Sequence, residues 1–256
     1  MKQMNKWIWS VVALGWLLIG QCWASDEDWL KNEVLKQISE LRQDNTELHK
    51  EVDTLKKAVA AKGINKGSDD KRTVAELKGN KPVLGSPTAK VLVVEFTDFQ
   101  CPFCRKFGLN TFPQVKEQFV EKGLIQYVVR DFPLGFHDKA KQASLAANCA
   151  GKQNAYWDMK QKILGGQESL AKDFYTLQAK ELKLNVEKFE HCLGDKEMLA
   201  SIDKGLAYAN SIGIQATPSF LIGRIDGREV KNIKAVSGAM TIEAFGQTVE
   251  SLLKSK

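Results

Sequence analysis

The stretch Val91–Lys106, VLVVEFTDFQCPFCRK, decides the fold of this 256-residue chain. It begins with four consecutive apolar residues, mostly β-branched, which is typical of a strand buried on both faces of a sheet. The apolar run breaks at Asp98 and Gln100, and the chain then reaches Cys101 and Cys104. Beyond the break, apolar residues recur every three to five positions, which predicts a helix. These residues are Phe103, Phe107, Phe112, Val115 and Phe119.

The position of Cys101 at the start of this helix favours redox chemistry. The unpaired N–H groups and the dipole of a helix N-terminus stabilise a thiolate, and they can lower a thiol pKa from about 8.5 to roughly 3.5–7.5. Pro102 suits the first turn because it has no N–H to leave unpaired. Cys104 lies one turn further along the same face, where it can resolve a mixed disulfide formed at Cys101. We therefore predict a redox pair, with half of a copper or zinc site as the alternative.

Residues 1–24 have the features of a secretory signal peptide. Lys2 and Lys6 precede an apolar run over Trp7–Ile19, and Ala24 precedes the polar sequence SDED. The run is shorter than the roughly 18 residues that a membrane span needs, although a membrane anchor is the alternative. We predict cleavage after Ala24 and export to the periplasm.

Export bears on the remaining cysteines, because disulfides persist in oxidising compartments. Loss of Cys22 with the signal peptide leaves four cysteines, an even count. If Cys101 and Cys104 are the redox pair, Cys149 and Cys192 either form a second disulfide or are two buried free thiols. The net charge of +6 is spread along the chain, with no basic stripe interleaved with aromatic residues, so no nucleic-acid partner is expected.

An unbroken heptad repeat runs through residues 34–59. Position a is occupied by Ile38, Asn45, Val52 and Val59, and position d by Val34, Leu41, Leu48 and Leu55. Mostly β-branched residues at a with Leu at d favour two parallel strands, and one buried Asn fixes their register. The alternative is a helix lying on its own domain, but this apolar seam is too narrow to cover a globular face. We predict a coiled-coil oligomerisation helix over 25–62, with a dimer preferred and a trimer open.

The rest of the chain predicts an α/β domain with a helical insertion. Residues 63–80 are rich in glycine and charges and indicate a linker containing a short helix at Val74–Lys78. In the domain, 81–256, the next strand is expected at Ile125–Val129, which would complete a right-handed βαβ unit. From about 137 to 213 the pattern is helical. The sheet then resumes at Ala216–Gly223, with a hairpin strand at Arg228–Val236 and a closing helix at Met240–Leu253.

On these motifs the chain resembles the DsbA-like disulfide oxidoreductases of the bacterial envelope, a group within the thioredoxin superfamily. Three features carry the resemblance: Glu95-Phe96 before the cysteines, the sequence Cys101-Pro102-Phe103-Cys104, and Thr217-Pro218 at the start of a late strand. Phe132-Pro133-Leu134 with His137 also resembles the start of that family's helical insertion. The resemblance covers roughly residues 81–256. It implies a thioredoxin fold with a helical insertion, here preceded by the N-terminal oligomerisation helix.

The resemblance also implies roles for five residues. Cys101 resembles the nucleophile, and Cys104 resembles the more buried resolving thiol. Pro218, preceded by Thr217, resembles the cis-proline that faces the disulfide and binds an extended substrate. Glu95 resembles the buried acid beneath the cysteines, a proton relay for Cys104; the alternative is an edge-strand carboxylate with no role.

Two departures from the strongly oxidising members bear on the activity. The dipeptide between the cysteines is Pro-Phe rather than Pro-His, so one source of thiolate stabilisation is missing. Thr217 is found in the dimeric isomerases, where the monomeric oxidases tend to have Val. With the predicted coiled coil, these features indicate an oligomeric oxidoreductase with isomerase or mixed oxidase–isomerase activity.

The implied partners are unfolded or misoxidised exported proteins and a membrane redox partner of the DsbB or DsbD type, with no cofactor. Two other classes compete with this interpretation. One is an oligomeric envelope protein that binds copper or zinc through Cys101 and Cys104, and the other is an oligomeric binding or chaperone scaffold whose cysteines are idle.

Overall fold

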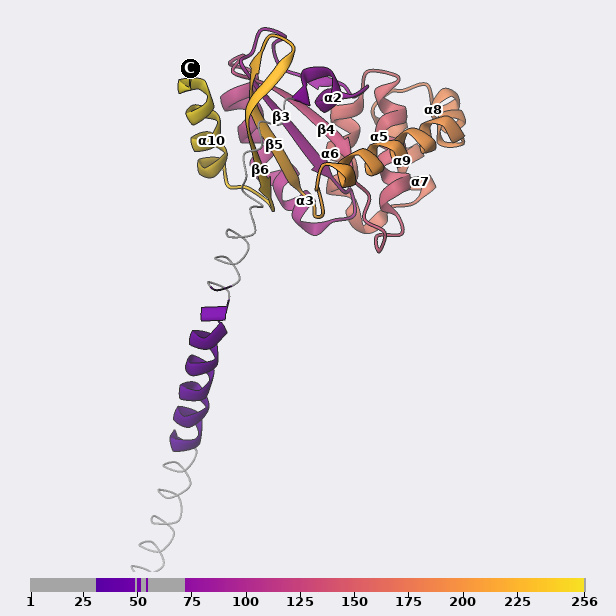
Figure 1. Ribbon diagram of the computed structural model, residues 1–256. Helices are drawn as coiled ribbons and strands as arrows, with labels where there is room; N and C mark the ends of the chain where they lie inside the picture. The colour runs from indigo at the N-terminus through magenta and orange to yellow at the C-terminus, as the bar shows by residue number, and fades with distance from the viewer. Residues whose placement is uncertain (1–30, 49, 52–53, 55–71, 256) are drawn as a thin grey trace, which may run out of the picture. The chain divides into compact units, whose positions relative to one another are not determined.

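The computed structural model describes residues 31–48, 50–51, 54 and 72–255 (Figure 1). The chain divides into two compact units, Met1–Lys66 and Gly67–Lys256. The predicted signal peptide, 1–24, and the heptad positions at 52, 55 and 59 lie outside the described residues.

The described part of the first unit is helical over 31–48, 50–51 and 54, as the heptad repeat predicts. Its apolar side chains are open to solvent: Val34 is 50% exposed, Ile38 40%, Leu41 67% and Leu48 59%. Association of this helix with a second chain stays a prediction.

The described part of the second unit is built on a mixed sheet of six strands in the order β1-β6-β5-β3-β4-β2. The strands are β1 Arg72–Thr73, β2 Val83–Leu84, β3 Val91–Thr97, β4 Ile125–Asp131, β5 Ser219–Asp226 and β6 Glu229–Ser237. The strands β3 and β4 are parallel, starting from Val91 opposite Ile125, and the other pairs are antiparallel. The predicted βαβ unit is therefore present, with β3, the helical segment that follows the cysteines and β4 in succession.

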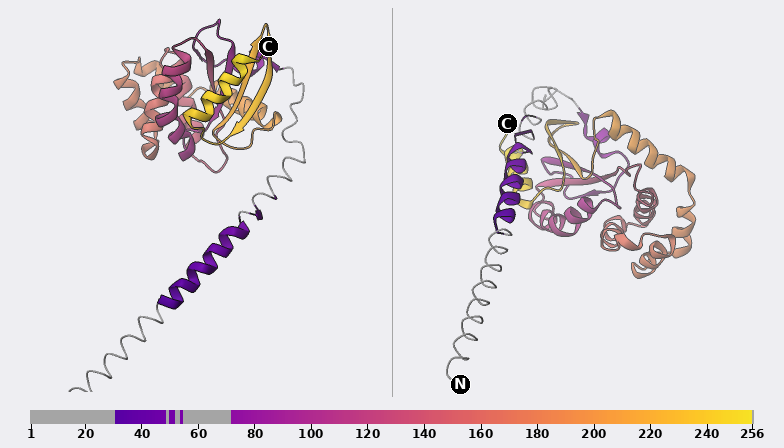
Figure 2. Two further views of the ribbon diagram at one scale, coloured as in Figure 1. Left: turned by 90° about the vertical axis from the view of Figure 1, so that its left-hand side faces the viewer. Right: turned by 90° about the horizontal axis from the view of Figure 1, so that it is seen from below.

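Helices cover both faces of the sheet (Figures 1 and 2). Those outside the insertion are α2 Val74–Lys78, α3 Pro102–Lys106, η1 Phe107–Thr111, α4 Phe112–Val115, η2 Lys116–Val120 and α10 Ile242–Lys254. The insertion contains α5 Ala140–Gly151, α6 Tyr156–Gly165, η3 Gln167–Ser169, α7 Lys172–Glu181, α8 Val186–Leu193 and α9 Lys196–Ser211. In Figure 1 the helices of the insertion lie to the right of the sheet and α10 lies to its left.

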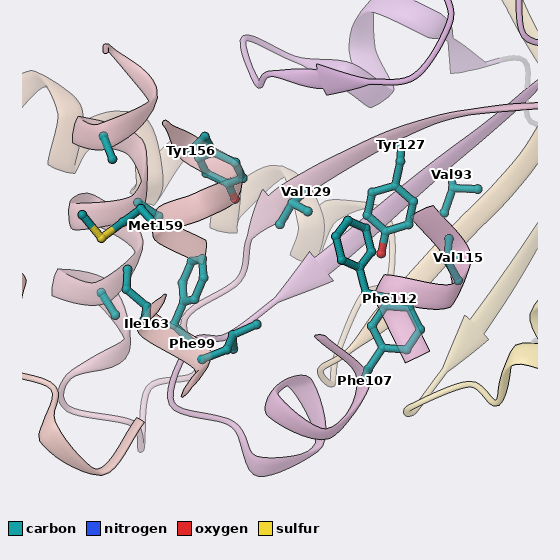
Figure 3. Packing of buried hydrophobic residues seen from close by; sticks show 14 of the residues in the cluster. Val93, Phe99, Phe107, Phe112, Val115, Tyr127, Val129, Tyr156, Met159 and Ile163 are labelled. Atoms are coloured by element: carbon teal, nitrogen blue, oxygen red, sulfur yellow. The ribbon is translucent and has the colours of Figure 1, made fainter. Parts of the chain in front are cut away.

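The central strand β3 divides the core into two layers, because successive side chains point to opposite faces. Val91 and Val93 enter the larger cluster, which also contains the aromatic residues shown in Figure 3. Leu92 and Val94 enter a smaller cluster on the other face, which also receives Leu77 from α2. By the same alternation, Glu95 points to the face of the larger cluster.

The helix that follows the cysteines is interrupted by π turns. The N–H of Phe112 donates to the carbonyl of Phe107 and closes such a turn. Pro113 has no N–H, so the carbonyl of Leu109 cannot receive the regular α-helical bond. The five-residue gap in the apolar pattern corresponds to this wider turn, which keeps both phenylalanines in the core. Phe103 does not join them: it is 61% exposed.

The folded unit begins earlier than the predicted boundary at residue 81. The strand β1 pairs with β6, and the helix α2 buries Leu77. Thr73 and Glu76 form a capping box at the start of α2, since the Thr73 hydroxyl accepts the N–H of Glu76 and the Glu76 carboxylate accepts the N–H of Thr73. The predicted linker, 63–80, therefore includes residues that belong to the sheet and its cover.

A disulfide between Cys149 and Cys192 joins α5 to α8 across 43 positions of the sequence. Of the two alternatives that the sequence left open, the structure contains the bridge. Because it closes a long loop, it reduces the entropy of the unfolded chain.

Replacement of both Cys149 and Cys192 by Ala is expected to lower the free energy of unfolding by about 2–4 kcal/mol, the usual effect of losing such a bridge. Urea denaturation followed by circular dichroism measures it. The matched control is the chain with Cys101 and Cys104 changed to Ala, which keeps the bridge. Equal midpoints for wild type and the Cys149/Cys192 variant would show that the bridge does not stabilise the insertion.

Candidate active site

Strand β3 leads into the segment with Cys101 and Cys104, and a loop that is distant in the sequence, at Thr217–Pro218, lies beside Cys101. Cys101 is the N-cap residue of α3, with Pro102 at the first helical position. The Thr217–Pro218 peptide bond is cis. The Cys101 sulfur lies 3.4 Å from the carbonyl oxygen of Thr217, across 116 positions of the sequence. Both cysteines are buried and free, and Cys101 is 4% exposed.

The surroundings of Cys101 make its thiol acidic. A hydrogen bond with the Cys104 side chain is the largest cause that lowers the pKa of Cys101, from 9.0 to about 5. Burial opposes the shift, while Thr217 and the backbone N–H groups of Phe103 and Cys104 add to it. The Thr217 hydroxyl is buried without another partner among the described residues, so it is available to donate to the thiolate. The two backbone N–H groups are the donors that the helix N-terminus predicts, and the side chains of Cys104 and Thr217 add to them.

The surroundings of Cys104 have the opposite effect. Burial raises the pKa of Cys104 well above its usual value, and the hydrogen bond and negative charge of Cys101 raise it further. The backbone N–H of Asp98 donates to the Cys104 sulfur at 3.4 Å. At neutral pH the pair therefore consists of a thiolate at Cys101 and a thiol at Cys104, the division of labour expected of a nucleophile and a resolving group.

Glu95 is fully buried in the middle of β3, between β4 and β5, so it is not an edge-strand carboxylate. Its Oε2 accepts the hydroxyl of Tyr127 at 2.8 Å and the ammonium of Lys160 at 3.0 Å. Its Oε1 is buried with no hydrogen-bond partner among the described residues. The negative charge of Glu95 acts with burial to raise the pKa of Tyr127 well above its usual value, so the phenol keeps its proton and remains a donor. The relay role of Glu95 stays a prediction.

Lys160, which the sequence analysis did not identify, completes this group. It lies in α6 with its side chain fully buried, and its ammonium lies 4.5 Å from the centre of the Phe112 ring. Only Gln161 separates Lys160 from Lys162 in α6, yet Lys162 pairs with Glu181 on the surface. The position of Lys160 on the buried face, one turn before Ile163 and Leu164, was the available signal.

The described residues contain no group of three or more His, Cys, Asp or Glu side chains that could hold a metal ion. Among the same residues, no helix has the length and apolar character that crossing a bilayer requires.

Three comparisons place this site among known proteins. A family model described as Thioredoxin matches residues 77–250. The chain is 29% identical over 200 residues to Disulfide bond formation protein D of Bacillus subtilis, covering 74% of this chain and 84% of that protein. The crystal structure of Wolbachia pipientis alpha-DsbA1 is 28% identical, with a TM-score of 0.60, covering 68% of this chain and 91% of that one.

A further relative is much longer than the matched region. The Na(+)/H(+) antiporter NhaA 3 of Salinispora tropica is 31% identical over 159 residues, which cover 62% of this chain and 24% of the antiporter. The chain therefore spans about a quarter of the length of this relative.

Replacement of Lys160 by Met is expected to lower the free energy of unfolding by about 3–5 kcal/mol, because it leaves the Glu95 charge buried without a cation. Adding Glu95→Gln should recover most of that loss, since no unpaired charge then remains. Urea denaturation measures both. Lys162→Met is the matched control in the same helix, where the exposed pair with Glu181 is worth at most about 1 kcal/mol. A double variant no more stable than Lys160→Met would contradict the pairing.

Proposed function

The chain belongs to the thioredoxin family and to its DsbA-like protein-disulfide oxidoreductases, and from that premise we propose that it catalyses thiol–disulfide exchange in exported proteins through Cys101 and Cys104. The proposal rests on one observation, the difference between the pKa of Cys101 and the pKa of Cys104. Cys101 caps a helix with its pKa lowered to about 5, while Cys104 is buried with its pKa raised. Pro218 and Thr217 would bind the extended substrate beside Cys101, and Glu95 would exchange a proton with Cys104.

As an oxidase, the protein begins with a Cys101–Cys104 disulfide. A substrate thiolate attacks the Cys101 sulfur, the bond to Cys104 breaks, and Cys104 takes up a proton as it leaves. A second substrate thiolate then attacks the substrate sulfur of the mixed disulfide and releases Cys101 as a thiolate. The substrate is oxidised, its electron pair passes to the two cysteines, and a membrane partner of the DsbB type would reoxidise them.

As an isomerase, the protein begins reduced, and the Cys101 thiolate attacks a mispaired disulfide of the substrate. A partner of the DsbD type would keep the cysteines reduced. The low pKa of Cys101 favours the oxidase direction, because a stabilised thiolate stabilises the reduced form. Thr217 and the predicted coiled coil favour isomerase activity, so both directions belong to the proposal.

We place this chemistry in the periplasm. The Cys149–Cys192 disulfide supports an oxidising compartment, as does the signal peptide predicted over residues 1–24.

The acidity of Cys101 gives a direct test. Alkylation of the reduced protein by iodoacetamide should rise with a midpoint near pH 5, whereas an ordinary thiol titrates near 8.5. Because the folded-state pKa is depressed, the thiolate stabilises the reduced fold fully above the usual thiol pKa, and this stabilisation is lost as pH falls through about 5. Stopped-flow alkylation with peptide mass spectrometry measures the profile. A midpoint near 8.5 would overturn the proposal.

Two ribonuclease assays separate the two directions. Oxidation of reduced ribonuclease measures the oxidase direction, and reactivation of scrambled ribonuclease measures the isomerase direction. Cys101→Ala should abolish both activities, because it removes the nucleophile. A reduction potential of the Cys101–Cys104 pair near −120 mV, measured against glutathione, would favour the oxidase direction, and a far more reducing value would argue against it.

We also propose that the N-terminal helix joins two copies of the chain in parallel. Its described seam residues, Val34, Ile38, Leu41 and Leu48, are 40–67% exposed. An exposed apolar seam of this kind marks an interaction surface, and its a/d pattern fits a second copy of itself. Two catalytic units on one coil would act on the same substrate at high effective concentration.

Replacement of both Leu41 and Leu48 by Glu should convert the dimer to a monomer, because charges would enter the seam at two d positions. Sedimentation equilibrium on the full chain measures the mass. Gln43→Glu, which adds a charge at the outer f position, is the matched control and should leave the dimer intact. A monomeric wild-type chain, or a double variant that stays dimeric, would rule out this seam.

A further inference from the structure

Asp98 is a second buried carboxylate beside the cysteines, and the exchange mechanism above does not use it. It is fully buried. Its Oδ1 accepts the backbone N–H groups of Gln100 at 2.7 Å and Cys101 at 3.1 Å, and its own N–H donates to the sulfur of Cys104 at 3.4 Å. One residue therefore holds the main chain that leads into Cys101 and contacts the sulfur of Cys104.

The other oxygen of this carboxylate reaches the loop that leads into the helical insertion. Oδ2 accepts the N–H of Leu134 at 2.7 Å and lies 2.9 Å from Nδ1 of His137. An ionised carboxylate only accepts hydrogen bonds, so His137 must carry a proton on Nδ1 in this contact. The His137 side chain is 17% exposed, so water screens the contact weakly.

The negative charge of Asp98 lies close to Cys101 and disfavours its thiolate form. A negative charge near a thiol opposes formation of the thiolate, and a proton donor on that charge reduces the opposition. His137 is the side chain that supplies such a donor to Asp98 within the described residues.

We propose that Asp98 and His137 form a positioning pair for the exchange reaction. Asp98 fixes the loop that presents both cysteines, and His137 offsets the charge of Asp98 so that it does not oppose the Cys101 thiolate. This inference rests on the proposed function, because it assigns a role in the same reaction.

The neighbours of His137 in the loop supply a matched control. Asp138 accepts from the Gln100 side-chain amide at 3.0 Å, and the Lys139 N–H donates to the Gln100 side-chain carbonyl at 2.7 Å. Both residues hold Gln100 and not the carboxylate of Asp98. Asp138→Asn therefore removes a charge from the same loop and leaves the Asp98–His137 contact in place.

The test measures alkylation of Cys101 in the full-length reduced chain at two pH values. The lower pH is 5, where an ordinary Asp carboxyl is ionised and Cys101 is near its own pKa. His137→Leu should slow alkylation at pH 5 about two- to fivefold, because the unopposed Asp98 charge raises the Cys101 pKa. At pH 8 the rate should match wild type, since the thiolate is fully formed in both. His137→Asn, whose amide N–H can replace Nδ1–H, should retain most of the pH 5 rate, and Asp138→Asn should retain it in full.

The second variant separates charge from structure. Asp98→Asn in the His137→Leu background should restore the pH 5 rate, because the opposing charge is gone. A double variant as slow as His137→Leu would overturn the pair, and so would a wild-type profile in His137→Leu. If His137→Leu lacks the native circular dichroism spectrum, Asp98→Asn alone decides: pH 5 alkylation at least as fast as wild type supports the pair, and slower alkylation overturns it.

Failure of the pair differs from failure of the proposed function. If wild-type Cys101 itself behaves as an ordinary thiol at pH 5, both the proposed function and the positioning pair are contradicted. If wild-type Cys101 is acidic and none of the variants changes its profile, only the positioning pair falls.

Discussion

Strand β3 and the residue that directly follows it bring two carboxylates, Glu95 and Asp98, into the interior just before the redox cysteines, and other parts of the fold supply their hydrogen-bond partners. Both are fully buried, and an unpaired charge in that environment would be prohibitively costly. Lys160 of α6 reaches Glu95, and the loop with Leu134 and His137 reaches Asp98. Both sets of partners come from the helical insertion or the loop leading into it. The contacts of these two carboxylates therefore hold the insertion against the thioredoxin sheet, in addition to the packing of the apolar core.

The acidity of Cys101 depends on the Cys104 side chain, the Thr217 side chain and backbone N–H donors, and not on the side chain of Phe103. From the sequence, Phe103 is expected to stabilise the Cys101 thiolate less than a histidine would, since a neutral ring removes one source of thiolate stabilisation. In the structure that ring is 61% exposed, and the Phe103 contribution to the lowered pKa comes from its backbone N–H, with larger effects from Cys104 and Thr217. A Pro-Phe dipeptide is thus compatible with a reactive thiol, because the helix N-terminus supplies donors whatever the side chain.

Local patterns predicted the parts of the fold that local chemistry determines. The apolar run at Val91, the CxxC at a helix start and the late hairpin all form as expected, since their periodicity and turn residues specify them. The five-residue step from Phe107 to Phe112 corresponds to a π turn, although by itself such a step indicates only helical spacing. The early start of the folded unit was missed because its capping box, Thr73 with Glu76, lies in a stretch whose glycines and charges resemble a linker.

The polar interior could not be predicted in the same way, because it depends on which distant elements meet. In α6, Lys160 and Lys162 look alike in the sequence, yet one is fully buried against Glu95 and the other lies on the surface. Apolar side chains of the same volume could fill the place of a buried ion pair with no loss of stability, and often with a gain. Stability alone therefore gives no reason for a charged pair at this depth. The proton-relay role proposed for Glu95 would give such a reason, because its Oε1 has no partner among the described residues and Cys104 gains or loses a proton each time its sulfur leaves or attacks.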